Sequence, residues 1–387
     1  MLKLNKLFSA AGQEECYLAQ ITPQKEERTF LEQCRDKIRK HLRKGIQDAT
    51  VSILGMPHAV VPRFRTQGSW SYDTCIRPAS QPPQEMDWDY GVYLPVVVWE
   101  ENGPPHVMAK LYFELVEGLL RSLCSYEGWK LVPGKETCIR VKVADWAHID
   151  LPLYAAPEEQ FLQIVEKRQL AKADSATQAL TADSAEFMNM PEQDWAELDT
   201  IVMATRKGEW IKSDPEQVSR WFNDRALDFG PQLKRICRYI KGWRDFHWMD
   251  GGPSSVCLMI AIAQNFNPQQ GRDDLTLEHA ANHLASALLL DVHEPAIDDG
   301  EHNFNRLNHE ERALAAQRAR ELHDTLRQAR RLELSIKFHA PVMLRKQFGD
   351  RIPDKPDWID LEVNQESIRN TEARRVSRPV VTATQAG

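Results

Sequence analysis

Two apolar stretches of this chain carry carboxylates at positions where a buried strand would normally carry none. The stretch 86–98 (MDWDYGVYLPVVV) is rich in β-branched and aromatic residues, which predicts a strand. Because side chains alternate faces along a strand, Asp87 and Asp89 should point the same way, about 7 Å apart, with Trp88 directed into the packing. Like carboxylates side by side repel, and their burial without a partner is unfavourable. The pair therefore indicates a cation site or, as the plainer alternative, a solvated turn.

A third carboxylate, Asp150, lies in a second apolar run. The runs 138–143 and 148–154 are separated by Ala-Asp-Trp-Ala and predict a hairpin. A buried salt bridge would be one reason for a charge at this position. A shared cation site is the other, since a carboxylate on a strand next to Asp87 and Asp89 would let two Mg²⁺ ions sit roughly 4 Å apart. One ion would then hold a triphosphate, and the other would lower the pKa of an attacking ribose hydroxyl.

Gly68 and Ser69, within TQGSWSYDT, form the next part of the pattern. A glycine at the start of a helix lets the backbone approach a phosphate, and the free N–H groups there attract anions. Ser69 would add a hydroxyl contact to the β- or γ-phosphate. Gly-Ser alone or Asp-x-Asp alone carries little information. All three parts in the order Gly-Ser, Asp-x-Asp and strand aspartate make a specific pattern.

That order is the signature of the polymerase-β-like nucleotidyltransferases, and the surrounding segments narrow the resemblance. The segments PRFRTQGSWSYDT, QEMDWDYGVYLP, HIDLPLYA, WFNDR, KGWRD, GGPSS and QFGDR resemble those of the bacterial cGAS/DncV-like nucleotidyltransferases. They recur from about residue 60 to residue 352, so the resemblance covers most of the chain. It implies a cyclic dinucleotide synthase that joins ATP and GTP into 3′,3′-cyclic GMP–AMP as a signal in CBASS anti-phage defence. Asp87, Asp89 and Asp150 would be its catalytic metal ligands, with two Mg²⁺ ions, or Mn²⁺, as cofactor.

The resemblance also implies a set of nucleotide contacts around the aspartates. Lys241 would contact the donor triphosphate, although on its own it belongs to a basic stripe typical of a solvated helix face. Ser213 would contact nucleotide and is also a good helix cap. Asp299 would read guanine, with Asp298 as the alternative. The implied nucleotide-binding residues are Gln67, Gly68, Ser69, Tyr72 (stacking on a base), Arg140, Ser213, Lys241, Ser255 and Asp299.

Hydrophobic periodicity predicts an α+β fold, with a helix-flanked sheet first and a helical region after it. Apolar residues recur at three- and four-residue steps from Leu31 to Ile46, which predicts a long amphipathic helix beginning at Thr22-Pro23. A second helix is expected at about 105–125, and the pattern is helical from about 215 onward. With the resemblance, this becomes a polymerase-β-like nucleotidyltransferase core, a mixed sheet flanked by helices with a long N-terminal helix, followed by a C-terminal helical domain.

The domain boundaries follow from composition. The segment 170–192 is rich in Ala, Ser, Thr and Asp, and is the predicted crossing between the two regions. We therefore predict a core with the N-terminal helix at 1–190, a helical domain closing the nucleotide cleft at 191–362, and a flexible tail at 363–387.

Overall composition excludes several classes of protein. The chain has 387 residues with a net charge of −7, and a protein bound to duplex DNA usually shows a basic excess instead. Its seven cysteines form no CxxC pair, which is typical of reduced cytosolic thiols. No run approaches the roughly 18 apolar residues of a membrane span, and the N-terminus does not resemble a secretory signal. We expect a cytoplasmic protein without a membrane or a DNA activator.

Two questions stay open from the sequence. A linear product, as the oligoadenylate synthases make, and a catalytically idle nucleotide-binding partner protein are the alternatives to a cyclic product. The tail ending in Gly387 would suit an E1/E2-like conjugating enzyme, since family members of this kind are often encoded beside such enzymes. An ordinary disordered tail is the alternative there.

Overall fold

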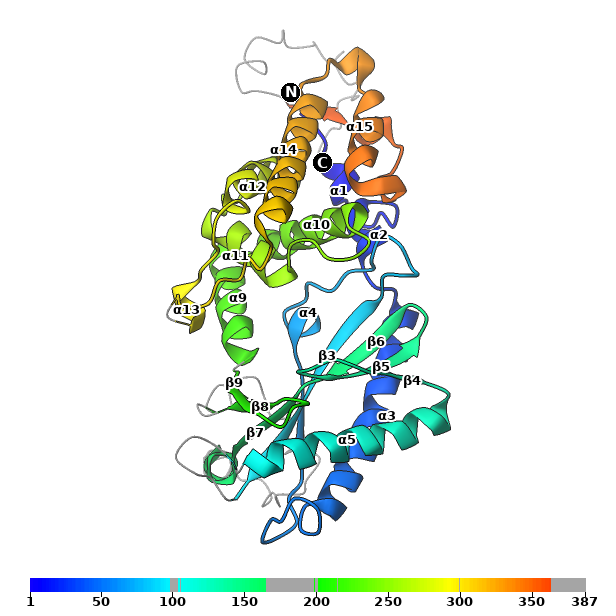
Figure 1. Ribbon diagram of the computed structural model, residues 1–387. Helices are drawn as coiled ribbons and strands as arrows, with labels where there is room; N and C mark the ends of the chain where they lie inside the picture. Colours follow the sequence, from blue (N-terminus) through cyan, green and yellow to red (C-terminus); the bar gives the residue numbers. More distant parts are fainter. Residues whose placement is uncertain are drawn as a thin grey trace, which may run out of the picture.

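The computed structural model describes residues 1–97, 104, 106–164, 198, 201–213, 215–298 and 300–362. Within this part of the chain, a sheet with two long helices against it forms one end of the molecule, and the other long helices form the opposite end (Figure 1). The predicted crossing at 170–192, the boundary near residue 190 and the tail at 363–387 lie outside the described residues. The division into domains therefore stays a prediction.

The sheet has eight strands in the described residues, in the order β4-β5-β6-β3-β7-β8-β9, with β2 also paired to β3. It is mixed, because β3 runs parallel to β6 and to β7 while the other pairs are antiparallel. The strands are β2 Arg63–Thr66, β3 Met86–Val96, β4 Lys130–Val132, β5 Ile139–Ala144, β6 Ala147–Leu151, β7 Leu153–Pro157, β8 Val202–Ala204 and β9 Trp210–Lys212.

Helices α3 (Lys25–Ala49) and α5 (His106–Glu127) pack with the sheet around one apolar cluster. The predicted stripe from Leu31 to Ile46 is buried in it, together with Tyr112 and Leu120 of α5. Along β3, Trp88 and Tyr90 join the same cluster, as expected from the alternation of side chains. The strand, the hairpin β5–β6 and both helices confirm the predicted elements.

The start of α3 differs from the prediction. Thr22 caps the C-terminus of α2 (Tyr17–Ile21), and its hydroxyl donates to the carbonyl of Leu18 (2.6 Å). The N-cap of α3 is Gln24, which forms a reciprocal capping box with Glu27. A glutamine replaces the usual Ser, Thr or Asp at this position, so the sequence pattern pointed to Thr22 two residues too early.

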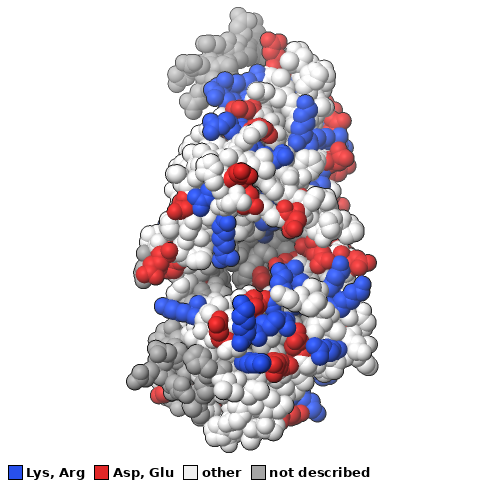
Figure 2. All heavy atoms as spheres, in the orientation of Figure 1, with Lys and Arg blue, Asp and Glu red and all other residues white. Residues whose placement is uncertain are grey.

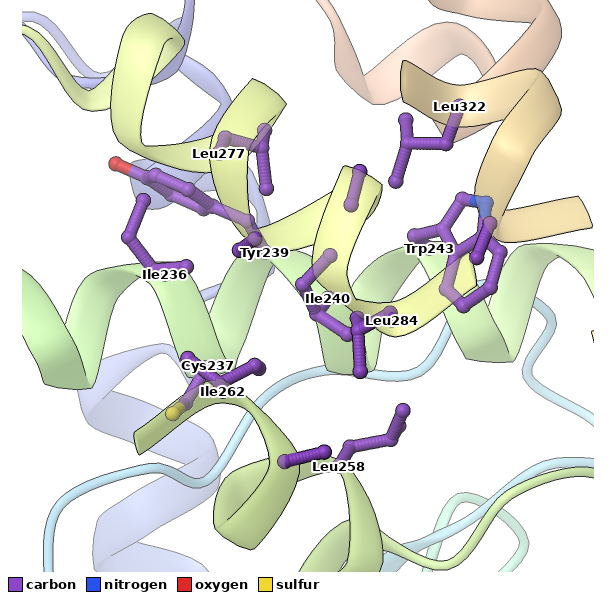
Figure 3. Packing of buried hydrophobic residues seen from close by; sticks show 14 of the residues in the cluster. Ile236, Cys237, Tyr239, Ile240, Trp243, Leu258, Ile262, Leu277, Leu284 and Leu322 are labelled. Atoms are coloured by element: carbon purple, nitrogen blue, oxygen red, sulfur yellow. The ribbon is translucent and has the colours of Figure 1, made fainter. Parts of the chain in front are cut away.

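The helical end forms a second apolar cluster around α10 (Pro231–His247). Ile236, Ile240 and Trp243 lie on the side of α10 toward α12 and α14, and Cys237 lies on the side toward α11 (Figure 3). Helix α11 is apolar on all sides and correspondingly buried. The helices here are α9 Pro215–Phe229, α11 Ser255–Gln264, α12 Asp273–Ala287, α13 Pro295–Asp298, α14 His309–Arg331 and α15 His339–Phe348, with 3₁₀ turns at Leu334–Ile336, Gly349–Arg351 and Pro356–Trp358.

The first residues of the chain also pack into the helical cluster. Strand β1 (Leu2–Lys3) pairs with β10 (Asp360–Leu361), and α1 (Asn5–Phe8) lies against α12. Tyr17 of α2 is fully buried against Tyr239 and Phe348. The domain prediction grouped these residues with the sheet, whereas their packing is with the helices. None of the helices in the described part of the chain combines the length and the apolar character that a bilayer crossing needs.

Gly242 in α10 tests this packing. A Cβ at Gly242 would overlap the hydroxyl of Tyr17, so we expect Gly242→Ala to lower the free energy of unfolding by about 1–3 kcal/mol. Alanine otherwise stabilises a helix interior, and Gly118→Ala on α5, where a Cβ meets nothing within 4 Å, should raise it by about 0.5–1 kcal/mol. Urea denaturation measures both. In a Tyr17→Phe background the loss at Gly242 should shrink, and an unchanged loss would contradict the proposed overlap.

Candidate functional site

A cavity of about 620 Å³ lies between the sheet and helices α10 and α11, in the size range of small-molecule sites. Figure 2 shows a hollow between the two ends of the molecule, with both basic and acidic side chains on its borders. The sheet side contributes Gly68, Ser69, Tyr72, Gln84, Glu85, Asp87, Asp89, Arg140 and His148, and the helical side contributes Lys241, Arg244, Asp245, Trp248, Met249, Asp250, Gly251, Ser255 and Val256.

Strand pairing brings the three predicted aspartates together. In the parallel register of β3 and β6, Asp87 lies opposite His148 and Asp89 lies opposite Asp150. In the antiparallel register of β5 and β6, Asp150 lies opposite Arg140. The guanidinium of Arg140 donates to both oxygens of Asp150, at 2.7 and 2.6 Å. The salt bridge considered as an alternative for Asp150 is thus present, in the same cluster as the other two carboxylates.

The carboxylates of β3 repel one another. Burial and the negative charges of Asp87 and Asp150 raise the pKa of Asp89 to about 8. Burial also acts to raise the pKa of Asp87, but the nearby His148 outweighs it and holds that pKa below its usual value. The side chain of Asp87 is 44% exposed, so it remains accessible to a ligand.

A one-turn helix, α4 (Gly68–Ser71), closes one side of the carboxylate cluster. Gly68 has a φ of +59°, and a Cβ there would overlap Oδ2 of Asp89, so both backbone conformation and space require glycine. The indole N–H of Trp70 donates to the carbonyl of Asp87 (2.9 Å), and the backbone N–H of Gln67 donates to the carbonyl of Asp89 (2.9 Å). The Gly-Ser turn and the Asp-x-Asp strand therefore form one unit.

The opposite wall carries positive charge from α10. Lys241 is 6% exposed, and its ammonium donates to the carbonyl of Thr74 (2.7 Å). Burial lowers the pKa of this ammonium group below its usual value. Arg244 pairs with Asp245 (2.7 Å) and lies 3.3 Å from the hydroxyl of Ser255, the first residue of α11.

Other predicted contacts are placed differently. The Gln67 side chain donates to the hydroxyl of Tyr93 (2.6 Å) and is 5% exposed, and it does not line the cavity. Tyr72 lines the cavity but is 5% exposed and packs edge-on against Phe222. Ser213 follows β9 and is not a lining residue.

Two predicted residues, Asp299 and Gly387, lie outside the described residues. Asp298 is the alternative to Asp299 for guanine recognition. It is the last residue of α13, and its side chain accepts hydrogen bonds from the backbone of Gly300 and His302. It does not line the cavity, so the described residues leave the choice between the two aspartates open.

Sequence reasoning missed His148, which lies next to Asp87, and the pair Glu85 and Lys142 behind it. His148 is 5% exposed; its Nδ1 lies 2.7 Å from Oε2 of Glu85, and its Nε2 lies 3.0 Å from Oδ1 of Asp87. Lys142 contacts the other oxygen of Glu85 at 2.5 Å. The signal was the two-residue spacing of His148 and Asp150, which places both side chains on one face of a strand.

The side chains of the cluster suit a divalent cation. Asp87, His148 and Asp150 each offer a ligand atom, and these atoms lie within 4.8 Å of one another. Oδ1 of Asp87 and Nε2 of His148 are buried, and neither has an aligned hydrogen-bond partner among the described residues. With Asp89 alongside, the group offers carboxylate oxygens of the kind that Mg²⁺ and Mn²⁺ prefer. A cation here would relieve the repulsion that raises the pKa of Asp89.

Comparison with known proteins agrees with this geometry. Residues 62–154 match the family described as "Cyclic GMP-AMP synthase DncV-like, nucleotidyltransferase domain", and residues 230–360 match "Cyclic GMP-AMP synthase, C-terminal domain". The chain is 35% identical over 314 residues to the cyclic GMP-AMP synthase of Vibrio cholerae serotype O1, which covers 76% of this chain and 68% of the relative. The chain belongs to the DncV-like nucleotidyltransferase family. A further cyclic GMP-AMP synthase, of Escherichia coli strain TW11681, is 40% identical over 221 residues (55% of this chain, 49% of the relative).

Solved structures of DncV have a similar fold over most of this chain. Vibrio cholerae DncV in complex with the linear intermediate 5′ pppA(3′,5′)pG has a TM-score of 0.73 at 26% identity, covering 94% of this chain and 99% of that one. Escherichia coli DncV bound to 3′-deoxy GTP has a TM-score of 0.71 at 25% identity, covering 93% and 100%. The predicted family and fold class are confirmed, and this DncV-like chain is an enzyme of the nucleotidyltransferase class.

The raised pKa of Asp89 gives a stability prediction. In an unfolded chain this group titrates near pH 3.9, so its stabilising contribution in the cation-free protein is full below about pH 4 and is lost as the pH rises toward 8. Asp89→Asn removes the ionisable group and therefore this loss of stability at high pH. In EDTA we expect the variant to match the wild type near pH 4 and to exceed it at pH 8 by on the order of 2 kcal/mol, because cavity solvent screens part of the repulsion.

Thermal melts across this pH range, with and without Mg²⁺, measure the effect. Mg²⁺ should raise the melting temperature of the wild type much more than that of the variant. Asp145→Asn, at a carboxylate that is 91% exposed in the turn of the same hairpin, is the control and should change neither value. A variant less stable than the wild type at pH 8 in EDTA would contradict the repulsion.

Proposed function

We propose that this enzyme joins ATP and GTP into 3′,3′-cyclic GMP–AMP by two-cation nucleotidyl transfer in the cavity between the sheet and α10. The observation that carries the proposal is the likeness to Vibrio cholerae DncV, a structure of which holds the linear intermediate 5′ pppA(3′,5′)pG. The cavity of this chain supports it, with clustered carboxylates on one wall and Lys241 and Arg244 on the other.

Each wall has a defined task in this proposal. Asp87, Asp89 and Asp150 would hold two Mg²⁺ ions, which when bound neutralise phosphate charge and lower the pKa of the attacking ribose hydroxyl. Lys241 and Arg140 would neutralise the remaining charge of the triphosphate. Because Gly68 has no side chain, the backbone lies close to Asp89 and leaves room for a phosphate at this edge of the cluster.

The two aspartates of β3 provide the direct test. Purified protein is incubated with labelled ATP, GTP, CTP and UTP plus Mg²⁺, and phosphatase-resistant products are identified by mass spectrometry. We expect cyclic GMP–AMP from the wild type and a loss of at least about 10³-fold in Asp87→Ala/Asp89→Ala, because the cation ligands are gone. The control Asp145→Ala, in the exposed turn between β5 and β6, should keep full activity. Equal product from wild type and double variant would exclude this chemistry.

Lys241 tests the helical wall. Because its ammonium group is buried in the cavity wall, Lys241→Ala should raise the KM for the donor nucleotide about 10- to 100-fold. Lys234→Ala, seven residues earlier on α10 and away from the cavity, should leave the KM within twofold. Steady-state kinetics with each nucleotide varied in turn measures both. An equal effect of the two substitutions would mean that α10 contributes only general positive charge.

A linear dinucleotide is the second candidate product, because the molecule bound in the Vibrio structure is itself linear. The same mass spectrometry separates the two products, since a linear product keeps a 5′-triphosphate that phosphatase removes. An idle nucleotide-binding protein is disfavoured, because it has no use for a cluster of repelling carboxylates.

The biological setting belongs to the same proposal. A role in CBASS anti-phage defence, guanine reading by Asp299 and conjugation through Gly387 by an E1/E2-like enzyme rest on the family resemblance. A cytoplasmic location and the absence of a DNA activator rest on the charge and composition of the chain. The role in anti-phage defence is tested by plating phage on cells that carry the wild type or Asp87→Ala/Asp89→Ala, since protection should need the aspartates. Conjugation is tested by deleting Gly387 and comparing the high-mass conjugates in cells with those of the wild type.

A further inference from the structure

His148 has a geometry that the three-aspartate mechanism does not use. It lies on β6, is 5% exposed, and faces Asp87 across the parallel pairing of β3 and β6. Its Nε2 lies 3.0 Å from Oδ1 of Asp87, yet the two atoms are not aligned for a hydrogen bond. This buried nitrogen is therefore directed at the carboxylate cluster, with Asp87 at hydrogen-bond distance but outside good hydrogen-bond geometry.

Glu85 fixes the orientation of this imidazole. Oε2 of Glu85 lies 2.7 Å from Nδ1 of His148, and Oε1 contacts Lys142. With Lys142 on Oε1, the other oxygen of Glu85 is placed to accept a hydrogen bond from the imidazole. Nδ1 then carries the proton, and in the neutral imidazole Nε2 presents its lone pair to the cluster. A carboxylate behind a histidine is the usual support of a metal-ligating imidazole.

The spacing of the atoms also fits one coordination sphere. Adjacent ligands of an octahedral ion with bonds of about 2.1 Å lie about 3.0 Å apart. Oδ1 of Asp87 and Nε2 of His148 are separated by 3.0 Å, and the ligand atoms of Asp87, His148 and Asp150 all lie within 4.8 Å of one another.

We propose that Nε2 of His148, oriented by Glu85, is a nitrogen ligand to the cation held by Asp87 and Asp150, and that it makes this position select Mn²⁺ over Mg²⁺. Imidazole nitrogen binds first-row transition ions better than it binds Mg²⁺, whereas carboxylates serve both. The inference rests on the proposed function for the presence of a cation here, but it does not depend on which product is made.

A protonated His148 that pairs with Asp87 is the competing arrangement. Without a cation, burial acts to lower the pKa of His148, and the contact with Asp87 outweighs it and raises that pKa. Such an imidazolium would repel a cation from the cluster. The two arrangements therefore predict opposite effects when His148 is replaced.

The first test uses the wild-type protein. Mn²⁺ is added to the purified full chain at pH 7.5, and electron spin echo envelope modulation of the bound ion is recorded. A ¹⁴N modulation typical of imidazole supports ligation, and it should be lost in His148→Leu. Absence of nitrogen modulation from bound Mn²⁺ in the wild type would overturn the inference, and this readout needs neither a variant nor catalytic activity.

The second test measures affinity. Mn²⁺ binding is titrated by EPR, and Mg²⁺ binding by competition, in the wild type, His148→Leu and Glu85→Gln, with His283→Gln on α12 as a remote control. We expect His148→Leu and Glu85→Gln to weaken Mn²⁺ binding about 10- to 100-fold and Mg²⁺ binding within about threefold. Stronger binding of both ions by His148→Leu would overturn the inference in favour of the imidazolium.

The experiments distinguish a failure of this inference from a failure of the proposed function. A wild type that makes cyclic GMP–AMP but gives no nitrogen modulation overturns the histidine ligand alone. A wild type with the nitrogen ligand but without any dinucleotide product supports the ligand and counts against the synthase.

Discussion

The parallel pairing of β3 with β6 is the constraint on which the rest of the site depends. It places Asp87 opposite His148 and Asp89 opposite Asp150, so four polar groups meet on one face of the sheet. The opposite face of β3 packs Trp88 into the apolar cluster beneath α3 and α5. Strong burial on that face prevents the strand from shifting by one residue, because a shift would expose its apolar side chains and bury its carboxylates. Packing far from the cavity therefore fixes the positions of the charged groups within it.

The second requirement is a basic wall facing the acidic one, and this comes from the packing of the helical end. Gln84, just before β3, donates from its side-chain amide to the carbonyls of Asp245 and Trp248, both at 2.8 Å. The C-terminal end of α10 is thereby tied to the segment that leads into Asp87. Lys241 lies one turn earlier on α10, so the distance between the buried ammonium and the carboxylates is set by direct contacts between the two ends of the molecule.

Much of this arrangement could be predicted from sequence, where the local pattern and the fold agree. The alternation of side chains in β3 predicted that Asp87 and Asp89 share one face, and the helical period predicted the buried stripe of α3. The pairing register could not be predicted, because it depends on contacts between strands some sixty residues apart, and so the place of His148 opposite Asp87 was missed. Gln67 shows a similar limit. The family resemblance implied a nucleotide contact for Gln67, but its side chain donates to the hydroxyl of Tyr93 within the sheet.

Asp150 shows why the two explanations of a buried charge need not compete. A carboxylate has about four lone-pair sites, and the fork of Arg140 occupies two of them. The remaining sites stay available to a cation, while the two hydrogen bonds from the guanidinium fix the orientation of the carboxylate. Among the described residues Asp89 has no such partner, and burial together with the charges of Asp87 and Asp150 raises its pKa. In this cluster Asp150 is paired with Arg140 and Asp87 lies beside His148, whereas the charge of Asp89 is best compensated by a cation. Cation binding is therefore expected to relieve repulsion mainly at Asp89, while Arg140 orients Asp150, and His148 lies beside Asp87 as a further ligand of the same ion.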